Sequence, residues 1–537
     1  SKNQKNCNPS NISLATTHQP HRSSFAAANL TIMHDEGTKA GYPSSVDTSS
    51  PKRNKENSIW TGSYLPITLA NLTVVAVAAF DGLAIVAALP NIAKDLGNVS
   101  LSPWVLTAYL ATSALAAIVA GPIIDTIGVR KTFQITGLWF LFTSALAAIA
   151  PSMTLLIAAR SLQGIGGGLV IAVALASVGL AYPEKLRPTA FAANSMVWGT
   201  LGLGGPVLAG ALLELSGWRL IFVVQLPITA LALAMGWKRL PDAVDNSDKK
   251  KLNFDLTGIT LLSICIIASL IAVSELTKSP IPSAILFMAT GFFIYIYWRH
   301  SGQKNDPVLL QRHITKFPLS RIHAASALAL ITGLATDNYL PLYMQTTRGR
   351  SEAFASFSVV FLTVGWTVAA FATSKILKRR SEEDVILLGS TLMIPSVLLA
   401  GISVSFSYAL AVLFGAYFLI GASIGFISTS GLTLLQSSST PEEMGRTNSA
   451  HQFLRTLAIT YGVAIGGAIL LSVVKARTGD VESVRKVLSG DNITVASDTT
   501  EAIGSGLAWA HVFSGATACI GFLIAVSLYR KRKRFIS

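Results

Sequence analysis

Fourteen stretches of mostly apolar residues, each long enough to cross a lipid bilayer, constrain the fold of this chain more than any other feature. A membrane-spanning helix needs about 20 apolar residues, and 51% of the 537 residues are hydrophobic whereas only 13% are charged. Because lipid offers the backbone no hydrogen-bond partners, such stretches form α-helices. The sequence therefore predicts an all-α polytopic membrane protein with fourteen spans. The expected spans are 64–88, 103–121, 132–150, 154–181, 189–213, 219–238, 253–274, 283–298, 319–343, 354–376, 384–404, 407–434, 450–474 and 507–529.

The distribution of positive charge predicts how the chain is oriented. A net charge of +15 would suit a nucleic-acid partner, but Lys and Arg gather beside alternate ends of the spans. If the amino terminus is cytoplasmic, 27 of them lie near that side of the membrane and 9 near the other. Cytoplasmic loops carry such an excess. We therefore expect a multi-pass plasma-membrane protein with both termini cytoplasmic, a basic tail that anchors the chain beside anionic lipid, and no nucleic-acid partner.

Two parts of the chain resemble each other, which predicts an internal repeat of the kind found in transporters. The first helix of each part is expected to end in Leu-Pro, in "AALP" (87–90) and "NYLP" (338–341), and each fourth helix is followed by a Pro-Glu turn. The spans between the two parts are left over as an insert. The expected division is a disordered tail over 1–60, a six-helix bundle over 61–240, two linker helices over 241–300, a second six-helix bundle over 301–529 and a basic tail over 530–537.

One carboxylate interrupts the first apolar stretch, "LTVVAVAAFDGLAIVAALP" (72–90). Asp81 lies well inside it, where an unpaired charge costs roughly 3 kcal/mol or more. Arg160 lies inside the fourth stretch, and counting residues from the outer ends of the two helices puts both charges roughly 9 to 12 Å below the outer face. We therefore expect an intramembrane ion pair between Asp81 and Arg160 that takes part in proton coupling. A purely structural salt bridge is the alternative.

The turn "GPIIDTIGVRK" (121–131) joins the second and third spans. Gly121 and Gly128 allow close backbone approach and positive φ. Asp125 can accept hydrogen bonds or face a helix amino terminus, and Arg130 supplies an opposite charge. These residues predict a conformational latch, with a plain positively charged cytoplasmic turn as the alternative.

The fifth span contains "GTLGLGGPVLAG" (199–210), in which Gly205, Pro206 and Gly210 stand out. Small residues permit tight helix crossing, and proline loosens the hydrogen-bond ladder of the helix. Ordinary helix packing is the alternative.

Four residues are candidates for a substrate pocket. Gln163 shares a helix face with Arg160. Tyr109 and Trp198 offer aromatic surface, although aromatic residues near span ends commonly lie in the membrane interface. Asp337, near the outer end of the ninth span, could attract a cation or could be an interfacial charge.

These motifs together carry a family resemblance. The turn 121–131 resembles the signature loop of the major facilitator superfamily, "RSLQG" (160–164) resembles its span-4 motif, and "GPVLAG" (205–210) resembles the span-5 motif of its antiporters. Further segments are similar to the fourteen-span drug:proton antiporters of this superfamily over about residues 64 to 530. The segments are "FDGLAIVAALP" (80–90), "WVLTAYLA" (104–111), "GWRLIFVVQLPI" (217–228), "YLPLYMQ" (339–345) and "FLRTLAITYGVAI" (453–465).

The chain also departs from the antiporter pattern. Leu83 and Val86 stand where these transporters usually have Thr and Asn, Val129 stands where they usually have a further Arg, and Ala209 where they usually have Gly. The loss of two polar groups beside Asp81 changes the usual environment of that carboxylate.

The resemblance implies a secondary exporter that exchanges amphipathic drugs or toxic compounds for protons by alternating access. Export of a specific metabolite, lipid or siderophore on the same fold is the first alternative, and a sensor that transports nothing is a remote one. An enzyme is not expected, because the chain has no His-Glu-x-x-His motif and no paired aspartates on adjacent spans. We expect a monomer that binds protons and a small-molecule substrate, with no cofactor and no metal.

Overall fold

The protein is described by a computed structural model over residues 58–97, 101–241, 255–276, 279–488 and 495–536. Within these ranges every regular element is a helix and none is a strand. The all-α prediction is therefore confirmed. The predicted disorder of residues 1–60 falls almost wholly outside the described residues.

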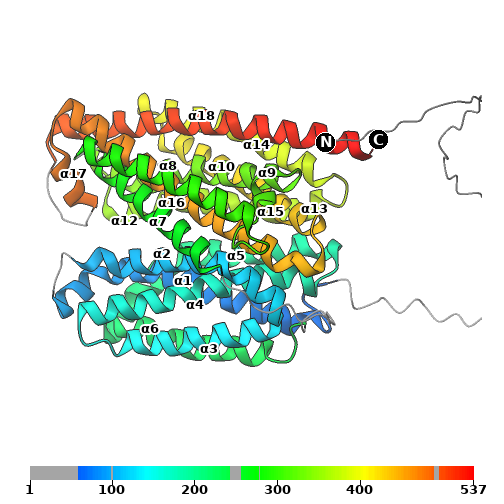
Figure 1. Cartoon of the computed structure of the whole chain (residues 1–537). Helices are drawn as coiled ribbons and strands as arrows, with labels where there is room; N and C mark the ends of the chain where they lie inside the picture. Colours follow the sequence, from blue (N-terminus) through cyan, green and yellow to red (C-terminus); the bar gives the residue numbers. More distant parts are fainter. Residues whose placement is uncertain (1–57, 98–100, 242–254, 277–278, 489–494, 537) are drawn as a thin grey trace, which may run out of the picture. The chain divides into compact units, whose positions relative to one another are not determined.

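Six long helices come first in the chain and are joined by short connections (Figure 1). Gly128, with φ of 84°, is the single residue between the second and third of them, and glycine adopts such an angle without steric cost. Apolar side chains form two buried clusters in this group, one around Phe133 and Val173 and one around Ile85 and Phe222. The helices are α1 (Tyr64–Leu96), α2 (Ser102–Ile127), α3 (Val129–Ala148), α4 (Met153–Ala181), α5 (Arg187–Ser216) and α6 (Arg219–Gly236).

Two further long helices, α7 (Leu256–Glu275) and α8 (Pro280–Gln303), separate the first group from the second. They pack against each other, and Leu261 and Tyr297 share a small apolar cluster with Phe453. The helices lie within the segment 241–300, whose role as an insert between two related bundles stays a prediction.

The second group follows the short helix α9 (Gln311–Thr315) and holds the largest buried apolar cluster of the described residues, around Tyr343, Tyr417 and Ile424. Its long helices carry the polar residues discussed below. The helices are α10 (Leu319–Asp337), α11 (Leu340–Thr346), α12 (Glu352–Phe357), α13 (Val360–Ile376), α14 (Glu382–Ser405), α15 (Leu410–Ser437), α16 (Met444–Arg477), α17 (Val481–Leu488) and α18 (Ser497–Ile536).

Each of the fourteen expected spans coincides with a helix or a pair of consecutive helices, but twelve of them are long and apolar enough to count as candidate membrane spans within the described residues. The two that fall short are α3 and α5. Both nevertheless expose apolar side chains, such as Leu138 on α3 and Leu208 on α5, which are 50% and 45% exposed. Fourteen spans therefore stays a prediction.

One local expectation was wrong. The first helix does not end at Leu-Pro, because α1 continues through Pro90 to Leu96; proline is tolerated within membrane helices. Helical structure also extends into the polar connection between the last two expected spans, because α16 ends only at Arg477, α17 lies within the connection and α18 begins at Ser497. The basic residues 530–536 are helical, and Arg532 forms an ion pair with Glu383 of α14.

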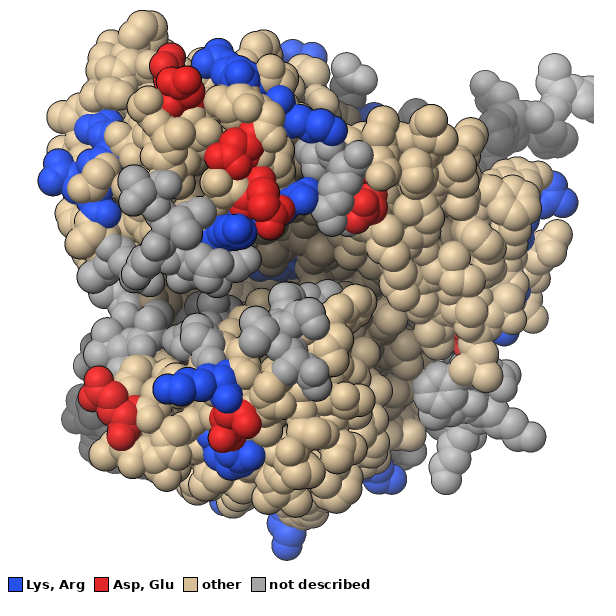
Figure 2. Space-filling view, turned by 90° about the vertical axis from the view of Figure 1, so that its left-hand side faces the viewer, with Lys and Arg blue, Asp and Glu red and all other residues tan. Residues whose placement is uncertain are grey.

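The two groups of helices touch at one end of the bundle, where α2 and α4 finish and α5 and α16 begin; we call this the closed end. Here α16 packs against α2 and α4. Further along the bundle α13 packs against the middle of α5, where Gly199 and Gly202 face Thr367 and Thr363. At the other end, which faces the viewer in Figure 2, the space-filling view shows a hollow between the first group below and the second group above. We call this the open end.

Candidate functional site

Asp81 and Arg160 form an ion pair that is completely buried between α1 and α4. Arg160 Nη1 donates to both carboxylate oxygens of Asp81 at 2.8 Å, and both side chains are 0% exposed. The expected pairing is therefore present. The α2 helix passes close to α4 beside the pair, since a Cβ on Gly164 would lie only 2.4 Å from the carbonyl oxygen of Tyr109, and Arg160 Nε donates to the Val105 carbonyl oxygen at 3.3 Å. The role of the pair in proton coupling stays a prediction.

Two glutamine side chains complete the polar cluster around Asp81. Gln225 Nε2, from α6, donates to Asp81 Oδ1 at 2.9 Å. Gln163 Oε1 accepts from Arg160 Nη1 at 2.7 Å, and Gln163 Nε2 donates to Ser144 Oγ at 2.9 Å and to Gln225 Oε1 at 3.2 Å. Four helices thus contribute polar groups to one network. Buried networks of this kind hold their members in one arrangement.

Aromatic rings cover the guanidinium of Arg160. Its Cζ lies 4.2 Å from the ring centroid of Tyr109 and 5.7 Å from that of Phe222. Arg160 Nη2 and the Tyr109 hydroxyl are both buried and have no hydrogen-bond partner among the described residues. Tyr109 and Gln163, expected to line a substrate pocket, therefore surround the ion pair directly.

The latch residues divide into two sets. Asp125 accepts hydrogen bonds from the backbone N–H groups of Gly445 at 2.8 Å and Arg446 at 3.0 Å, at the first turn of α16. Gly121 faces the same turn, because a Cβ there would lie 2.6 Å from Cα of Arg446. Arg130 instead donates to the carbonyl oxygen of Leu240, past the end of α6. Asp125 also forms an ion pair with the side chain of Arg446, at 3.7 Å, and Gly128 makes the turn between α2 and α3.

The glycines of α5 that approach another helix are not those singled out from the sequence. A Cβ on Gly199 or Gly202 would contact Thr367 or Thr363 of α13, whereas a Cβ on Gly210 would meet nothing within 4 Å. Gly205 is buried. The side chain of Pro206 lies outside the described residues, as do those of Leu83 and Val86.

Trp198 and Asp337 lie elsewhere in the bundle. Trp198 on α5 is 44% exposed. Asp337 ends α10 and is 7% exposed, and its Oδ1 has no hydrogen-bond partner in the described part of the chain. Its carboxylate is therefore enclosed by protein, and its role as a cation site or an interfacial charge stays a prediction. No contact of either residue with the Asp81 network is found among the described residues.

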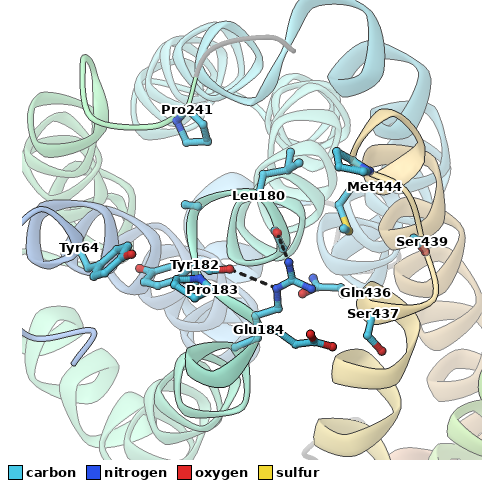
Figure 3. Close-up of a pocket in the computed structure, with 14 residues that line it drawn as sticks. Tyr64, Leu180, Tyr182, Pro183, Glu184, Pro241, Gln436, Ser437, Ser439 and Met444 are labelled. Atoms are coloured by element: carbon cyan, nitrogen blue, oxygen red, sulfur yellow. Dashed lines mark hydrogen bonds between the residues drawn. The ribbon is translucent and has the colours of Figure 1, made fainter. Parts of the chain in front are cut away.

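A cavity of about 610 Å³ lies between the two groups at the closed end (Figure 3). Tyr64 and Tyr182 stack along one wall with ring centroids 5.5 Å apart. Arg187 donates to the carbonyl oxygens of Gly179 and Tyr182, and thereby satisfies the end of α4. Gln436, from α15, lines the opposite wall, and its Nε2 donates at 3.0 Å to the carbonyl oxygen of Leu175. The second group is thus tied to α4 beside this cavity.

A polar hub ties α7, α8 and the segment after α8 together. Asp255 caps α7 by accepting from the Gly258 N–H at 3.0 Å, and also accepts from the Val308 N–H, from His300 Nε2 at 2.7 Å and from Lys304 Nζ at 3.2 Å. Burial raises the pKa of this carboxyl, but the hydrogen bonds from His300 and the other donors outweigh it, so the pKa lies below its usual value. In the last turn of α1, hydrogen bonds from Arg219 and Trp218 similarly lower the pKa of Asp95.

Several of these residues were missed from the sequence. Gln225 and Ser144 lie in apolar stretches, where a buried polar side chain is itself a signal. Asp255 directly precedes a long apolar run, which is the usual place of a helix cap. A Gly-x-Ser-x-Gly sequence, which in hydrolases forms a turn that exposes a nucleophilic serine, occurs at 421–425 in the middle of α15. Here Gly421 packs against Leu362, and the Ser423 hydroxyl donates to the Leu419 carbonyl oxygen. These residues therefore serve helix packing. Within the described residues no group of three or more metal-ligating side chains is found.

Comparison with known proteins agrees with the fold. The model of the Major Facilitator Superfamily matches residues 72–463. Multidrug transporter protein MdtP of Bacillus subtilis (strain 168) is 25% identical over 411 residues, which are 75% of this chain and 74% of MdtP. Multidrug efflux pump SdrM of Staphylococcus aureus (strain N315) is 25% identical over 405 residues, 74% of this chain and 88% of SdrM.

Solved structures show the same architecture at low sequence identity. The human organic anion transporter MFSD10 has a TM-score of 0.60 at 13% identity and covers 87% of this chain and 100% of its own. A bacterial homologue of the iron transporter ferroportin, in an outward-facing state, has a TM-score of 0.58 at 13% identity and covers 87% of this chain and 99% of its own. The chain belongs to the major facilitator superfamily and is a multi-pass membrane transporter of that family.

Proposed function

We propose that this protein is a proton-coupled exporter of amphipathic drugs or toxic compounds, working as a monomer in the plasma membrane with both termini in the cytoplasm. The relatives MdtP and SdrM carry multidrug transport or efflux in their names. The observation that carries the coupling is the completely buried Asp81–Arg160 pair. A membrane helix retains such a charge when the charge has a task.

Alternating access requires that the two groups of helices separate at one end while they close at the other. The described state has its contacts at the closed end, where Asp125 binds the first turn of α16 and Gln436 binds Leu175. The hollow at the open end is the path by which a substrate would leave (Figure 2). In the proposed orientation this is an outward-facing state.

Proton exchange at Asp81 requires the ion pair to open. A protonated carboxyl offers Arg160 no counter-charge, so proton binding and pairing exclude each other at this site. Rearrangement of α1 against α4 then couples the proton to the change of access. One proton crossing 100 mV supplies roughly 2.3 kcal/mol, which sustains a substrate gradient of about 40-fold at about 1.4 kcal/mol per tenfold.

Purified protein in proteoliposomes tests this function. Proton release on addition of a panel of cationic, neutral and anionic amphipathic compounds identifies substrates, and an imposed pH difference then drives their accumulation. Asp81→Asn should abolish that accumulation but keep substrate binding. Asp95→Asn is the matched control, because Asp95 lies on the same helix but is 49% exposed and pairs with Arg219 at 2.6 Å.

Gradient-driven accumulation by Asp81→Asn at the wild-type level would show that the carboxylate is structural and that the proton binds elsewhere. Asp337, the buried carboxylate of α10, is then the next residue to test.

A further inference from the structure

In the described part of the chain, Arg160 and Arg455 both lie well inside membrane-spanning helices, and only Arg160 has a carboxylate partner there. Arg160 is paired with Asp81. Arg455, on α16, forms no ion pair and no hydrogen bond among the described residues, and its Nη1 is buried without a partner. An intramembrane guanidinium without a counter-charge is costly, and such residues mark substrate pathways.

Arg455 lies on the face of α16 that looks toward the centre of the bundle. Two turns earlier on the same face, Asn448 Oδ1 accepts at 3.0 Å from Gln436 Nε2, which also donates to Leu175 of α4. These bonds seal the closed end. Seven residues correspond to two helical turns and about 10 Å, so Arg455 lies just beyond the seal on the side of the hollow. Ile459, one turn further along, is 37% exposed.

An aromatic ring from a third helix accompanies the guanidinium. Arg455 Cζ lies 5.7 Å from the ring centroid of Trp366 on α13. Both side chains are partly exposed. A guanidinium beside a flat apolar ring suits a ligand that carries a carboxylate on an aromatic body, because the guanidinium binds the carboxylate and the ring packs against the aromatic body.

The aspartates of α1, α2 and α10 do not neutralise Arg455 in this state. Asp81 and Asp125 are occupied by Arg160 and by the start of α16. Asp337 is too far along the bundle. The contacts of His451 with His323 and of Gly462 with Ile331 set α10 beside α16, which places Arg455 level with about residue 326. Asp337 is then about 16 Å further along α10.

The other titratable neighbours of Arg455 are imidazoles. His451, one turn before it, lies with its Nδ1 3.0 Å from Nδ1 of His323. The Nε2 atoms of both rings are buried without partners. Imidazoles carry no negative charge in either protonation state, so they leave the guanidinium without a counter-ion.

We propose that Arg455 and Trp366 form the substrate subsite of this transporter, and that the substrate class it takes is an organic anion with an aromatic or similarly flat apolar body. The carboxylate receives hydrogen bonds from Arg455, and the apolar body lies against Trp366 toward the hollow. This inference rests on the proposed export function and names the substrate class for it.

A matched pair of probes tests the subsite by binding alone, without any gradient. 1-Naphthaleneacetate and 1-naphthaleneacetamide share one skeleton and differ in charge. Titration calorimetry on purified protein should show that the carboxylate binds at least about 10-fold more tightly than the amide, the discrimination expected of a charge-assisted hydrogen bond. Arg455→Gln should abolish this preference, and Arg455→Lys should retain part of it. Trp366→Leu should weaken both probes.

Arg219→Gln is the control, because Arg219 is 42% exposed and lies in an ion pair at the end of the bundle away from Arg455. Thermal unfolding of each variant shows that it is folded. Equal affinities of the wild-type protein for the two probes, binding of neither at millimolar concentration, or an unchanged preference in Arg455→Gln would each overturn the proposal. Displacement of the carboxylate by chloride at equal concentration would also overturn it, since the subsite would then hold any small anion.

Failure of this inference is distinguishable from failure of the export function. Proton release with cationic or neutral compounds in proteoliposomes would still show proton-coupled transport if the Arg455 subsite had no preference for anions.

Discussion

Asp125 of α2 accepts hydrogen bonds from the backbone N–H of Arg446, at 3.0 Å, and of its neighbour Gly445, at 2.8 Å, so that a carboxylate of the first helix group caps a helix of the second. A helix amino terminus presents unpaired N–H groups and a partial positive charge. The contact spans 320 residues of sequence. It must break whenever the closed end opens.

Asp125→Asn should leave the protein folded but shift its population toward the state that is open at the closed end. An amide keeps one acceptor oxygen and no charge, so roughly 1.5 to 3 kcal/mol of charge-assisted hydrogen bonding is lost, equivalent to about a 10- to 100-fold shift. Distances between spin labels on α2 and α16 measure the shift. Asp384→Asn is the control, since the hydrogen bond that this carboxylate accepts comes from the backbone N–H of Ser381 at the start of its own helix. If Asp125→Asn transports at the wild-type rate and has wild-type distances between α2 and α16, the turn 121–131 only determines membrane topology.

Gly121→Ala should disfavour the same closed contact by a steric route. The new methyl group would lie 2.6 Å from Cα of Arg446, a backbone atom that cannot rotate away, so α2 and α16 must separate. Increased labelling of a cysteine placed at Ser439, which lines the cavity at the closed end, checks this outcome. Gly415→Ala is the matched control because a Cβ there meets nothing within 4 Å. Unchanged labelling in Gly121→Ala would mean that the helices absorb a methyl group without moving.

Asp255→Asn should destabilise the α7–α8 insert in a pH-dependent way. The pKa of Asp255 is lowered in the folded protein, so its contribution is fully present above the unfolded pKa of about 3.9 and is lost as pH falls through the folded pKa. At pH 7 the variant should unfold more easily by about 1 to 3 kcal/mol. Below about pH 4 the difference from the wild type should shrink. Thermal unfolding in detergent across this pH range measures both effects, with Asp480→Asn as the control.

Cysteine labelling from each side of the membrane should confirm an even number of spans. Arg239→Cys and a cysteine within 530–537 should react only from the cytoplasm, and Lys486→Cys only from outside. Reaction of the two termini from opposite faces would contradict the fourteen-span reading and with it the two-helix insert. Within the described residues this test matters most for α3 and α5, because these two helices are less apolar than the helices that count as candidate membrane spans.

Depth along a helix could be predicted from the sequence, because each residue advances a helix by a fixed 1.5 Å. The apolar stretches gave the helices, and equal depth gave the pairing of Asp81 with Arg160. Helix ends were less predictable. Pro90 lies inside α1, since a membrane helix can continue past a proline whose freed carbonyl finds another partner.

Tertiary packing decided which way each side chain points around its helix axis and which residues it meets. Gln225 joins Asp81 across 144 residues, and Asp125 binds the start of α16 instead of Arg130 in its own turn. The sequence places Arg160 and Arg455 alike, each as one cation within an apolar stretch. Only the packed structure shows that Arg160 has a carboxylate at 2.8 Å and that Arg455 has none among the described residues. The counter-charge of an arginine comes from the helix that lies beside it, and side-chain packing between helices decides which helix that is.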